Sequence, residues 1–305
     1  MASYTYPVAR PSGTLTTEQI HLLLSNPNVI AKRMATLADQ KFIADFLLSG
    51  RFVAQGGGVF YETGEEIFAA DSTEAIEPGS AYPKTVLTAG EIAAAKTGKR
   101  GIATDITDEK ISREGMSYVS KALARLSNTV IRDVDSIAMA VIASKITSTA
   151  AASAAWSSPG AVLETLASEQ GQRAEGTGID LSTVVLKPEK FAKLIGMFVD
   201  KQALPREQAN IVLTGNLPFD ALGYTWATSP NYAGANPLFI DREQLGGMAD
   251  EPLVSPEFKS YGESNVQVAS ARPNGLDKYE VRARRVTVPV VTEPLAGLTI
   301  TGTGL

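Results

Sequence analysis

Residues that could perform nucleophilic or acid–base chemistry are sparse in this chain. His21 is the only histidine and cysteine is absent, which excludes thiolate catalysis, disulfides and Cys-ligated metals. His21 stands among leucines in an amphipathic segment, and no Gly-x-Ser-x-Gly nucleophile elbow accompanies it. We therefore expect a structural or surface role for this side chain.

Paired carboxylates and glycine-rich stretches have simpler explanations than catalysis or phosphate binding. The acid pair at 65–66 falls at an expected hairpin tip, and the pair at 108–109 falls at an expected helix start, where acids complement the dipole. Segment Lys96–Gly101 lacks the spacing of a P-loop. The glycines between 171 and 178 precede a strand, whereas the dinucleotide fingerprint follows one. The sequence thus predicts no catalytic residue, no cofactor and no metal site, although a carboxylate dyad assembled from distant segments stays open.

Two groups of basic residues leave two interpretations open. They are Lys96, Lys99 and Arg100, and Arg282, Arg284 and Arg285. Each group is either a solvated face or a contact with acidic surfaces of neighbouring copies. The net charge of −5 gives no general reason to expect tight nucleic-acid binding, which needs clustered Lys and Arg.

Composition and the N-terminal residues limit the classes of protein to which this chain can belong. Hydrophobic content of 44% and charged content of 20% are typical of a folded chain with a packed core. We expect no signal peptide, because the start has neither a charged nor an apolar region, and no apolar run reaches the roughly 20 residues of a membrane span. We also expect no large cleaved scaffolding-like segment before residue 1, and a start in the cytosol.

The N-terminal third reads as an arm followed by a long excursion. Helical spacing predicts helices at Thr17–Ser25 and Asn28–Leu48. Gly56–Gly58 predicts a flexible joint, and a β-hairpin is expected from 59 to 69 with Gly64 in its turn. The stretch 71–104 holds too little apolar matter to form a core, so we expect it to rest on another surface, often that of a neighbouring subunit.

The strongest periodic signal predicts one very long helix from Asp108 to about Thr147. Apolar residues recur there every three or four positions, Thr107 is a plausible N-cap, and Gly115 is expected to perturb the first turns. Such a helix would measure about 60 Å. The alternative is two ordinary helices broken near Asn128.

The rest of the chain predicts an α/β region and a β return, without internal repeats. A small-residue linker spans Ser148–Pro159, and Ser158 caps a helix that begins at Pro159. A further helix begins at Pro188. Strands are expected at Leu181–Leu186, Ile211–Leu213, Tyr224–Ala227, Leu238–Ile240, Tyr279–Val290 and Leu298–Ile300. The alternation of apolar residues shifts by one at 284–285, which predicts a β-bulge.

The order of these parts resembles the tailed-bacteriophage major capsid proteins of the Hong Kong ninety-seven type, across nearly the whole length. Lys96–Glu109 is similar to that family's return from an extended loop into its spine helix. Val184–Leu194 resembles the central strand and helix, and Leu222–Pro230 with Ala235–Asp241 resembles the strand–loop–strand that follows.

The resemblance implies an α+β capsid fold with four parts. Residues 1–56 would be the N-terminal arm and 57–106 an extended β-hairpin loop lying over an adjacent subunit. Residues 107–149 with 270–305 would form a peripheral domain with spine helix and β sheet. Residues 150–269 would be a central α/β axial domain.

The function that the resemblance implies is structural, not enzymatic. The chain would be a major capsid protein that self-assembles as pentamers and hexamers into an icosahedral shell around the phage genome. Portal, scaffold or decoration proteins are possible partners, double-stranded DNA is enclosed without sequence-specific binding, and no membrane is involved. The protein would belong to the virion and assemble in the host bacterial cytoplasm.

Some family members cross-link themselves through a Lys–Asn isopeptide bond promoted by a Glu. By resemblance, the candidates here are Lys84 or Lys96 with Asn274 and Glu280. Three alternative functions remain: a bacterial nanocompartment shell of the same fold, a soluble α/β hydrolase, and a tail or fibre protein.

Overall fold

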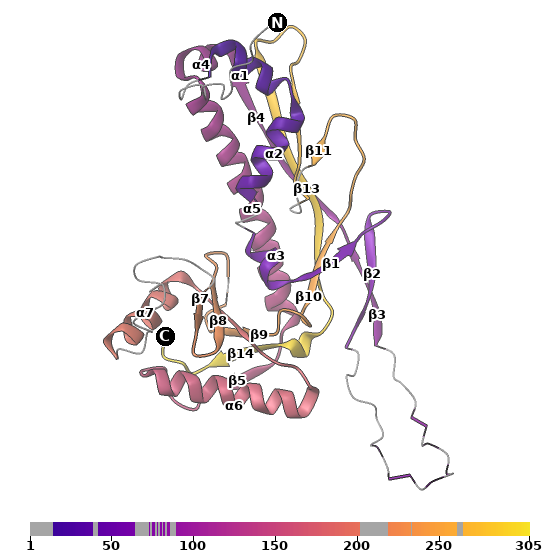
Figure 1. Cartoon of the computed structure of the whole chain (residues 1–305), viewed down its shortest axis with the longest axis vertical. Coiled ribbons are helices and arrows are strands. Elements are labelled where there is room, and N and C mark those ends of the chain that lie inside the picture. The colour runs from indigo at the N-terminus through magenta and orange to yellow at the C-terminus, as the bar shows by residue number, and fades with distance from the viewer. Residues whose placement is uncertain are drawn as a thin grey trace, which may run out of the picture. The chain divides into compact units, whose positions relative to one another are not determined.

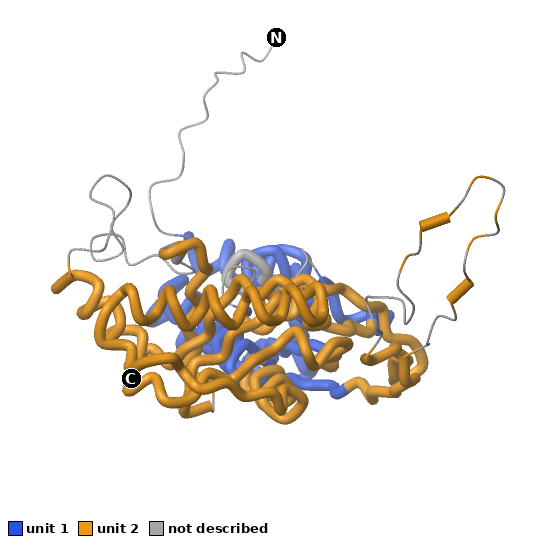
Figure 2. Tube along the Cα trace, turned by 90° about the horizontal axis from the view of Figure 1, so that it is seen from below, with its two compact units in different colours: residues 1–42, 98–134, 252–286 blue, residues 43–97, 135–251, 287–305 orange. Residues whose placement is uncertain are grey.

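The structure is a computed structural model that divides into two compact units (Figures 1 and 2). Unit 1 comprises residues 1–42, 98–134 and 252–286, and unit 2 comprises 43–97, 135–251 and 287–305. The residues described are 15–38, 42–64, 90–201, 219–232, 234–260 and 265–305, with isolated positions between 73 and 85. The expected strand Ile211–Leu213 lies outside the described residues.

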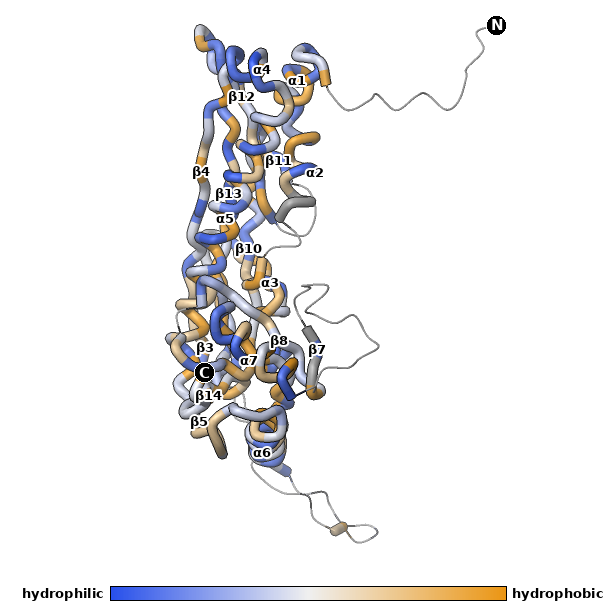
Figure 3. Tube along the Cα trace, turned by 90° about the vertical axis from the view of Figure 1, so that its left-hand side faces the viewer, coloured by the Kyte–Doolittle hydropathy of each residue, from blue (hydrophilic) through white to orange (hydrophobic). Residues whose placement is uncertain are grey.

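Two helices open unit 1. The helix α1 (Thr17–Leu24) begins at Thr16 in a capping box with Gln19, which satisfies two otherwise free N–H groups. The helix α2 spans Pro27–Ala38. Hydrophobic and hydrophilic residues mix along both helices (Figure 3), and the apolar ones that they bury are Ile20, Leu24, Ile30 and Met34.

The expected single helix Asn28–Leu48 is wrong. The helix α2 ends at Ala38, Phe42 is not helical, and a short helix α3 (Ile43–Leu47) begins in unit 2. The apolar residues keep helical spacing on both sides of the break, so spacing alone did not reveal it. The break lies close to the boundary between the two units.

The sheet of unit 1 has the strand order β4-β13-β12-β11. These strands are β4 (Gly98–Thr107), β13 (Lys278–Val291, whose last residues belong to unit 2), β12 (Gln267–Ala271) and β11 (Lys259–Ser260). The helix α2 packs against β12, and Ser270 donates a hydrogen bond to the Leu24 carbonyl oxygen at 2.6 Å. The inward residues Val268 and Val281 are fully buried.

The phase shift predicted at 284–285 coincides with a change of partner strand. β13 pairs antiparallel with β12 as far as Arg284 and with β10 (Gly246–Asp250) from Thr287 onward. Burial alternates along β13 as far as Ala283, and residues 283–287 are then all buried where the strand changes its neighbour.

The long helix expected from Asp108 is broken at Gly115, not near Asn128. The helix α4 (Asp108–Glu114) follows Thr107, which occupies the N-cap position without a side-chain hydrogen bond. Gly115 then has φ 61°, a conformation that disfavours residues with a Cβ, and α5 (Met116–Lys145) follows. In unit 1, α5 buries Val119, Leu123, Leu126 and Val130.

Unit 2 contains a six-stranded sheet with the order β5-β14-β9-β6-β8-β7. Its strands are β5 (Thr149–Ala151), β14 (Gly297–Thr301), β9 (Leu238–Ile240), β6 (Thr183–Leu186), β8 (Tyr224–Thr228) and β7 (Phe219–Ala221), and a 3-10 turn at Pro294–Ala296 precedes β14. Four of these strands match predicted ones, but β5 lies inside the predicted linker.

Two helices accompany this sheet as predicted. The helix α6 (Pro159–Thr177) begins at Ser158, whose hydroxyl accepts from the Ala161 N–H, and α7 (Pro188–Asp200) begins with proline in its first turn. In the core, the fully buried Trp226 ring lies edge-on to Phe198 and Trp156, each with ring centroids 6.3 Å apart.

Candidate assembly surfaces

A two-stranded ribbon in unit 2 is the first candidate surface. β2 (Gly58–Thr63) pairs antiparallel with β3 (Glu91–Lys96) along its whole length, and among the described residues neither strand has another partner. The partner of β2 lies some thirty residues further along the chain. The hairpin expected between 59–61 and 67–69 is not tested, because 67–69 lie outside the described residues.

The base of the ribbon is fixed to unit 2 by backbone turns and one carboxylate. Gly56 and Gly57 adopt φ of 65° and 86°, and Gln55 donates to the Gly58 carbonyl oxygen at 3.0 Å, so the residues of the expected joint form a tight turn. Glu251 accepts from the Gly57 N–H at 3.2 Å and from the Thr97 hydroxyl at 2.8 Å. One side chain thus holds the two residues that flank the base of the ribbon.

One face of the ribbon packs on unit 2. Val59, Tyr61 and Ala95 are partly buried against a small cluster formed by Ala54, Ala249 and Val290. Alternate residues of a strand point to opposite faces, so the other face carries Phe60 and Ile92.

The other face of the ribbon exposes large apolar side chains. Phe60 is 81% exposed and lies opposite Ala94, and Ile92 is 77% exposed and lies opposite Glu62, one diagonal step away. Burying a side chain of this size is worth about 1.5–3 kcal/mol. The ribbon therefore gains stability when another surface covers this face.

A groove in unit 1 is the second candidate surface. It has a volume of about 380 Å³ and lies between β4, which contributes Ile102 to Thr104, and the helices α4 and α5. Its basic side chains are Lys110, Lys121 and Arg125, and its acidic side chain is Glu114. We call it the β4–α5 groove.

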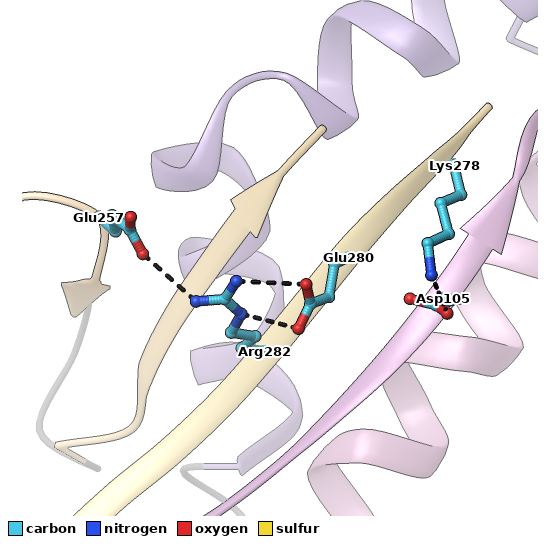
Figure 4. Close-up of polar contacts among 5 residues, drawn as sticks. All are labelled: Asp105, Glu257, Lys278, Glu280 and Arg282. Carbon is cyan, nitrogen blue, oxygen red and sulfur yellow. Dashed lines mark hydrogen bonds and ion pairs between the residues drawn. The ribbon is translucent and has the colours of Figure 1, made fainter. Parts of the chain in front are cut away.

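Ion pairs connect β4, β13 and the loop before β11 in unit 1 (Figure 4). Lys278 Nζ lies 2.6 Å from Asp105 Oδ2, and Arg282 donates to both carboxylate oxygens of Glu280, at 2.9 and 3.2 Å. Arg282 also reaches Glu257 at 3.3 Å. The hydrogen bonds from Arg282 hold the pKa of Glu280 below its usual value. These pairs fix the positions of neighbouring side chains on the sheet.

Neither predicted interpretation holds for Arg284 and Arg285, because both are buried. Arg284 donates to Gln267 Oε1 at 2.8 Å and lies over the Phe258 ring, 3.7 Å from its centroid. Arg285 is fully buried over the Phe42 ring at 4.7 Å. In the other basic group, Arg100 lies 3.9 Å from Asp133 and is half exposed.

His21 has the structural surroundings that the sequence predicts. Its ring lies 5.7 Å from the Tyr279 ring, and Nδ1 is 3.9 Å from Asp108 Oδ1. Asp108 is itself paired with Arg272 at 2.5 Å. Within the described part of the chain, no group of three metal-ligating side chains gathers.

The four cross-link candidates remain predictions. Lys84, Lys96 and Asn274 are exposed, while the carboxylate of Glu280 is engaged by Arg282. A cross-link would join different copies of the chain, so the contacts of one copy do not test it.

Sequence reasoning expected residues 57–106 to lie over a neighbouring subunit, but it missed the pairing of β2 with β3 and it missed the groove. The pairing of β2 with β3 was hidden because Glu91–Lys96 is rich in alanine and lacks a strand pattern. The groove could have been anticipated from Tyr118, Lys121 and Arg125, whose spacing places them on one flank of a helix.

These features define a class: a structural subunit with apolar and charged surfaces open to other proteins. The family model of phage capsid proteins matches residues 90–300, more than half of the chain. The chain therefore belongs to the phage capsid protein family. It is a capsid shell protein with a structural role, and it is a component of the virion.

Solved structures show the same fold at low sequence identity. A phage-related protein from Bordetella bronchiseptica RB50 has a TM-score of 0.56 and 13% identity, covering 90% of this chain and 97% of that one. The capsid protein of cyanophage P-SCSP1u has a TM-score of 0.52 and 11% identity, with 82% and 84% covered. A virus-like particle from Pyrococcus furiosus has a TM-score of 0.55 and 11% identity, with 89% and 97% covered.

No curated protein matches the sequence. The predicted α+β capsid fold is confirmed by the structural similarity. Among the described helices, none combines the length and the apolar character that a bilayer span requires.

Proposed function

We propose that this chain is the major capsid protein of a tailed bacteriophage, assembling as pentamers and hexamers into an icosahedral shell around double-stranded DNA. The observation that carries the proposal is the exposed apolar face of the ribbon, with Phe60 and Ile92. Folding of one copy leaves this surface in water, and burial against a neighbour makes assembly favourable. Assembly takes place in the host cytoplasm.

The parts of the chain receive the roles that the resemblance implies. Residues 57–106, which include the ribbon, lie over an adjacent subunit, and residues 1–56 act as an arm. Residues 107–149 and 270–305 form the peripheral domain, and 150–269 form the axial domain around the symmetry axes. Portal, scaffold and decoration proteins are further partners of the shell.

Replacing Phe60 and Ile92 by serine tests the role of the ribbon. We expect the variant Phe60→Ser/Ile92→Ser to fold but to lose particle formation, because each copy forfeits about 1.5–3 kcal/mol of burial per side chain. Negative-stain microscopy and sedimentation velocity measure the particles, and circular dichroism measures the fold.

Val254→Ser is the matched control. Val254 is a fully exposed apolar residue outside the ribbon, and its replacement should leave particle formation intact. A wild-type chain that stays a compact monomer at high concentration would refute the proposal.

A bacterial nanocompartment shell is the second candidate, favoured by the similarity to a virus-like particle from Pyrococcus furiosus. The content of purified particles separates the two. Nuclease-protected DNA in particles from infected cells supports the phage capsid, and a co-purifying cargo enzyme supports the compartment.

A further inference from the structure

The strand β4 has an edge that no described strand covers. It pairs with β13 on one side only, and most of its residues are exposed. Ile102, Ala103 and Thr104 all line the β4–α5 groove. Because three consecutive residues of β4 line it, the groove follows the backbone of this strand. An open edge offers backbone groups to an extended polypeptide.

The groove is positively charged. Lys110 comes from α4, and Lys121 and Arg125 come from successive turns of α5, against the single acid Glu114. Lys110 Nζ lies 4.8 Å from the centre of the Tyr118 ring. Within the described part of the chain, none of the three basic side chains has a carboxylate within ion-pair distance. A ligand that brings carboxylates would supply these partners.

One segment of the chain has the complementary composition. Residues 65–77 contain five acids and neither Lys nor Arg, and they follow the ribbon strand β2 directly. The acids are Glu65, Glu66, Asp71, Glu74 and Glu77.

We propose that the β4–α5 groove of one copy binds the acidic segment 65–77 of a second copy, as a strand added along β4. This inference rests on the proposed function, and it identifies the surface that receives the extended loop. A nucleic acid fits less well, since the open edge of a strand is satisfied by the backbone groups of a peptide.

Two reciprocal charge reversals test the contact between copies. Variant A is Lys121→Glu/Arg125→Glu, with an acidic groove and an acidic segment. Variant B is Glu65→Lys/Glu66→Lys/Asp71→Lys, with a basic groove and a segment that is basic overall. We expect each variant alone to associate poorly and an equimolar mixture to associate, because each groove then meets a segment of more favourable charge.

Sedimentation velocity of A, B and the mixture decides between outcomes. Co-association only on mixing supports the proposal. If A and B each assemble like the wild type, or if mixing restores nothing while both are folded by circular dichroism, the proposal is overturned. Failure of the proposed function is a separate result, read from the wild-type chain alone.

Peptide binding to the full-length chain provides a second measurement that does not depend on assembly. A fluorescent peptide of residues 65–77 should bind, and variant A should weaken binding about tenfold or more, which corresponds to the loss of two exposed ion pairs. Lys193→Glu, an exposed reversal on α7, is the matched control and should leave binding unchanged.

Two modified probes identify the mode of binding. The same peptide with N-methyl groups on alternate residues cannot donate a full set of ladder hydrogen bonds, and it should bind more weakly. A labelled 20-nucleotide DNA should bind more weakly than the peptide. Equal binding of the DNA, or peptide binding that variant A does not change, contradicts the assignment.

Discussion

Asp241 follows β9 directly and closes the turn that leads toward β10. Its carboxylate Oδ1 accepts a hydrogen bond from the Glu243 N–H at 2.9 Å, and its own N–H donates to the Ala296 carbonyl oxygen at 2.9 Å. The side chain is almost fully buried, and this desolvation raises the pKa of the Asp241 carboxyl above its ordinary value. The turn therefore keeps its geometry at the expense of an unfavourable buried charge.

The raised pKa of Asp241 predicts a pH dependence of stability. The folded state holds the proton more tightly than the unfolded state, so this carboxyl lowers the free energy of unfolding as the pH rises from the ordinary value of 3.8 through the raised pKa. Asp241→Asn retains the acceptor oxygen and removes the charge. We expect the variant to gain stability relative to the wild type over this window.

Urea unfolding of both chains on an acidic-to-neutral pH series measures the effect of Asp241. The difference in free energy of unfolding should be smallest at the most acidic pH, where both side chains are neutral. A difference that does not change with pH would mean that Asp241 does not titrate in this way.

Single residues were predictable where their role is local. Ser158, Pro159 and Pro188 mark helix starts because capping and ring geometry depend on nearest neighbours. The environment of Arg285 was not predictable, because it depends on Phe42, which lies far away in the sequence. Charge alone suggested a surface position for a side chain that is fully buried.

At the scale of elements, Gly115 decides where the long helical segment divides. It has φ 61°, and a Cβ there would meet no other atom within 4 Å, so any effect of Gly115→Ala comes from the backbone alone. We expect this substitution to destabilise the chain by about 1–2 kcal/mol.

Gly171→Ala is the matched control for Gly115. It lies within α6, also with free space around a Cβ, and should stabilise by about 0.5–1 kcal/mol through helix propensity. Thermal or denaturant unfolding measures both variants. Shifts of the same sign for the two glycines would contradict the role given to Gly115.

Elements were predictable where periodicity and capping agree, as in α6, α7, β9 and β14. The pairing of strands was less predictable than the elements themselves. The pattern of β2 indicates a strand, but a turn residue at Gly64 favoured a local partner over β3. Local turn signals cannot reveal a partner that follows a long intervening segment.

At the scale of the whole molecule, assembly and stability are linked. Anything that binds the folded state raises its apparent stability, so neighbouring copies act as ligands for one another. We expect the apparent Tm of the wild-type chain to rise with protein concentration, and that of Phe60→Ser/Ile92→Ser to stay constant. Differential scanning calorimetry over a hundredfold concentration range measures both, and parallel behaviour of the two chains would refute the linkage.

The capsid architecture and an assembly role for residues 57–106 were predictable from the order of parts, but the side chains that form the two surfaces were not. Exposure of Phe60 and Ile92 is a property of the folded ribbon, since an apolar residue in a strand is more often buried. The groove combines β4 with α4 and α5, so its basic side chains converge only after the chain has folded.

Glu251 has a mechanical consequence for a shell built from identical chains. The Glu251 carboxylate accepts hydrogen bonds from both Gly57 and Thr97. The strands β2 and β3 are therefore attached to unit 2 through the same side chain. A neighbour pressing on the ribbon must then tilt both strands as a pair. Such a paired arm can meet neighbours at slightly different angles while its pairing register stays the same, which a curved shell of chemically identical tiles requires.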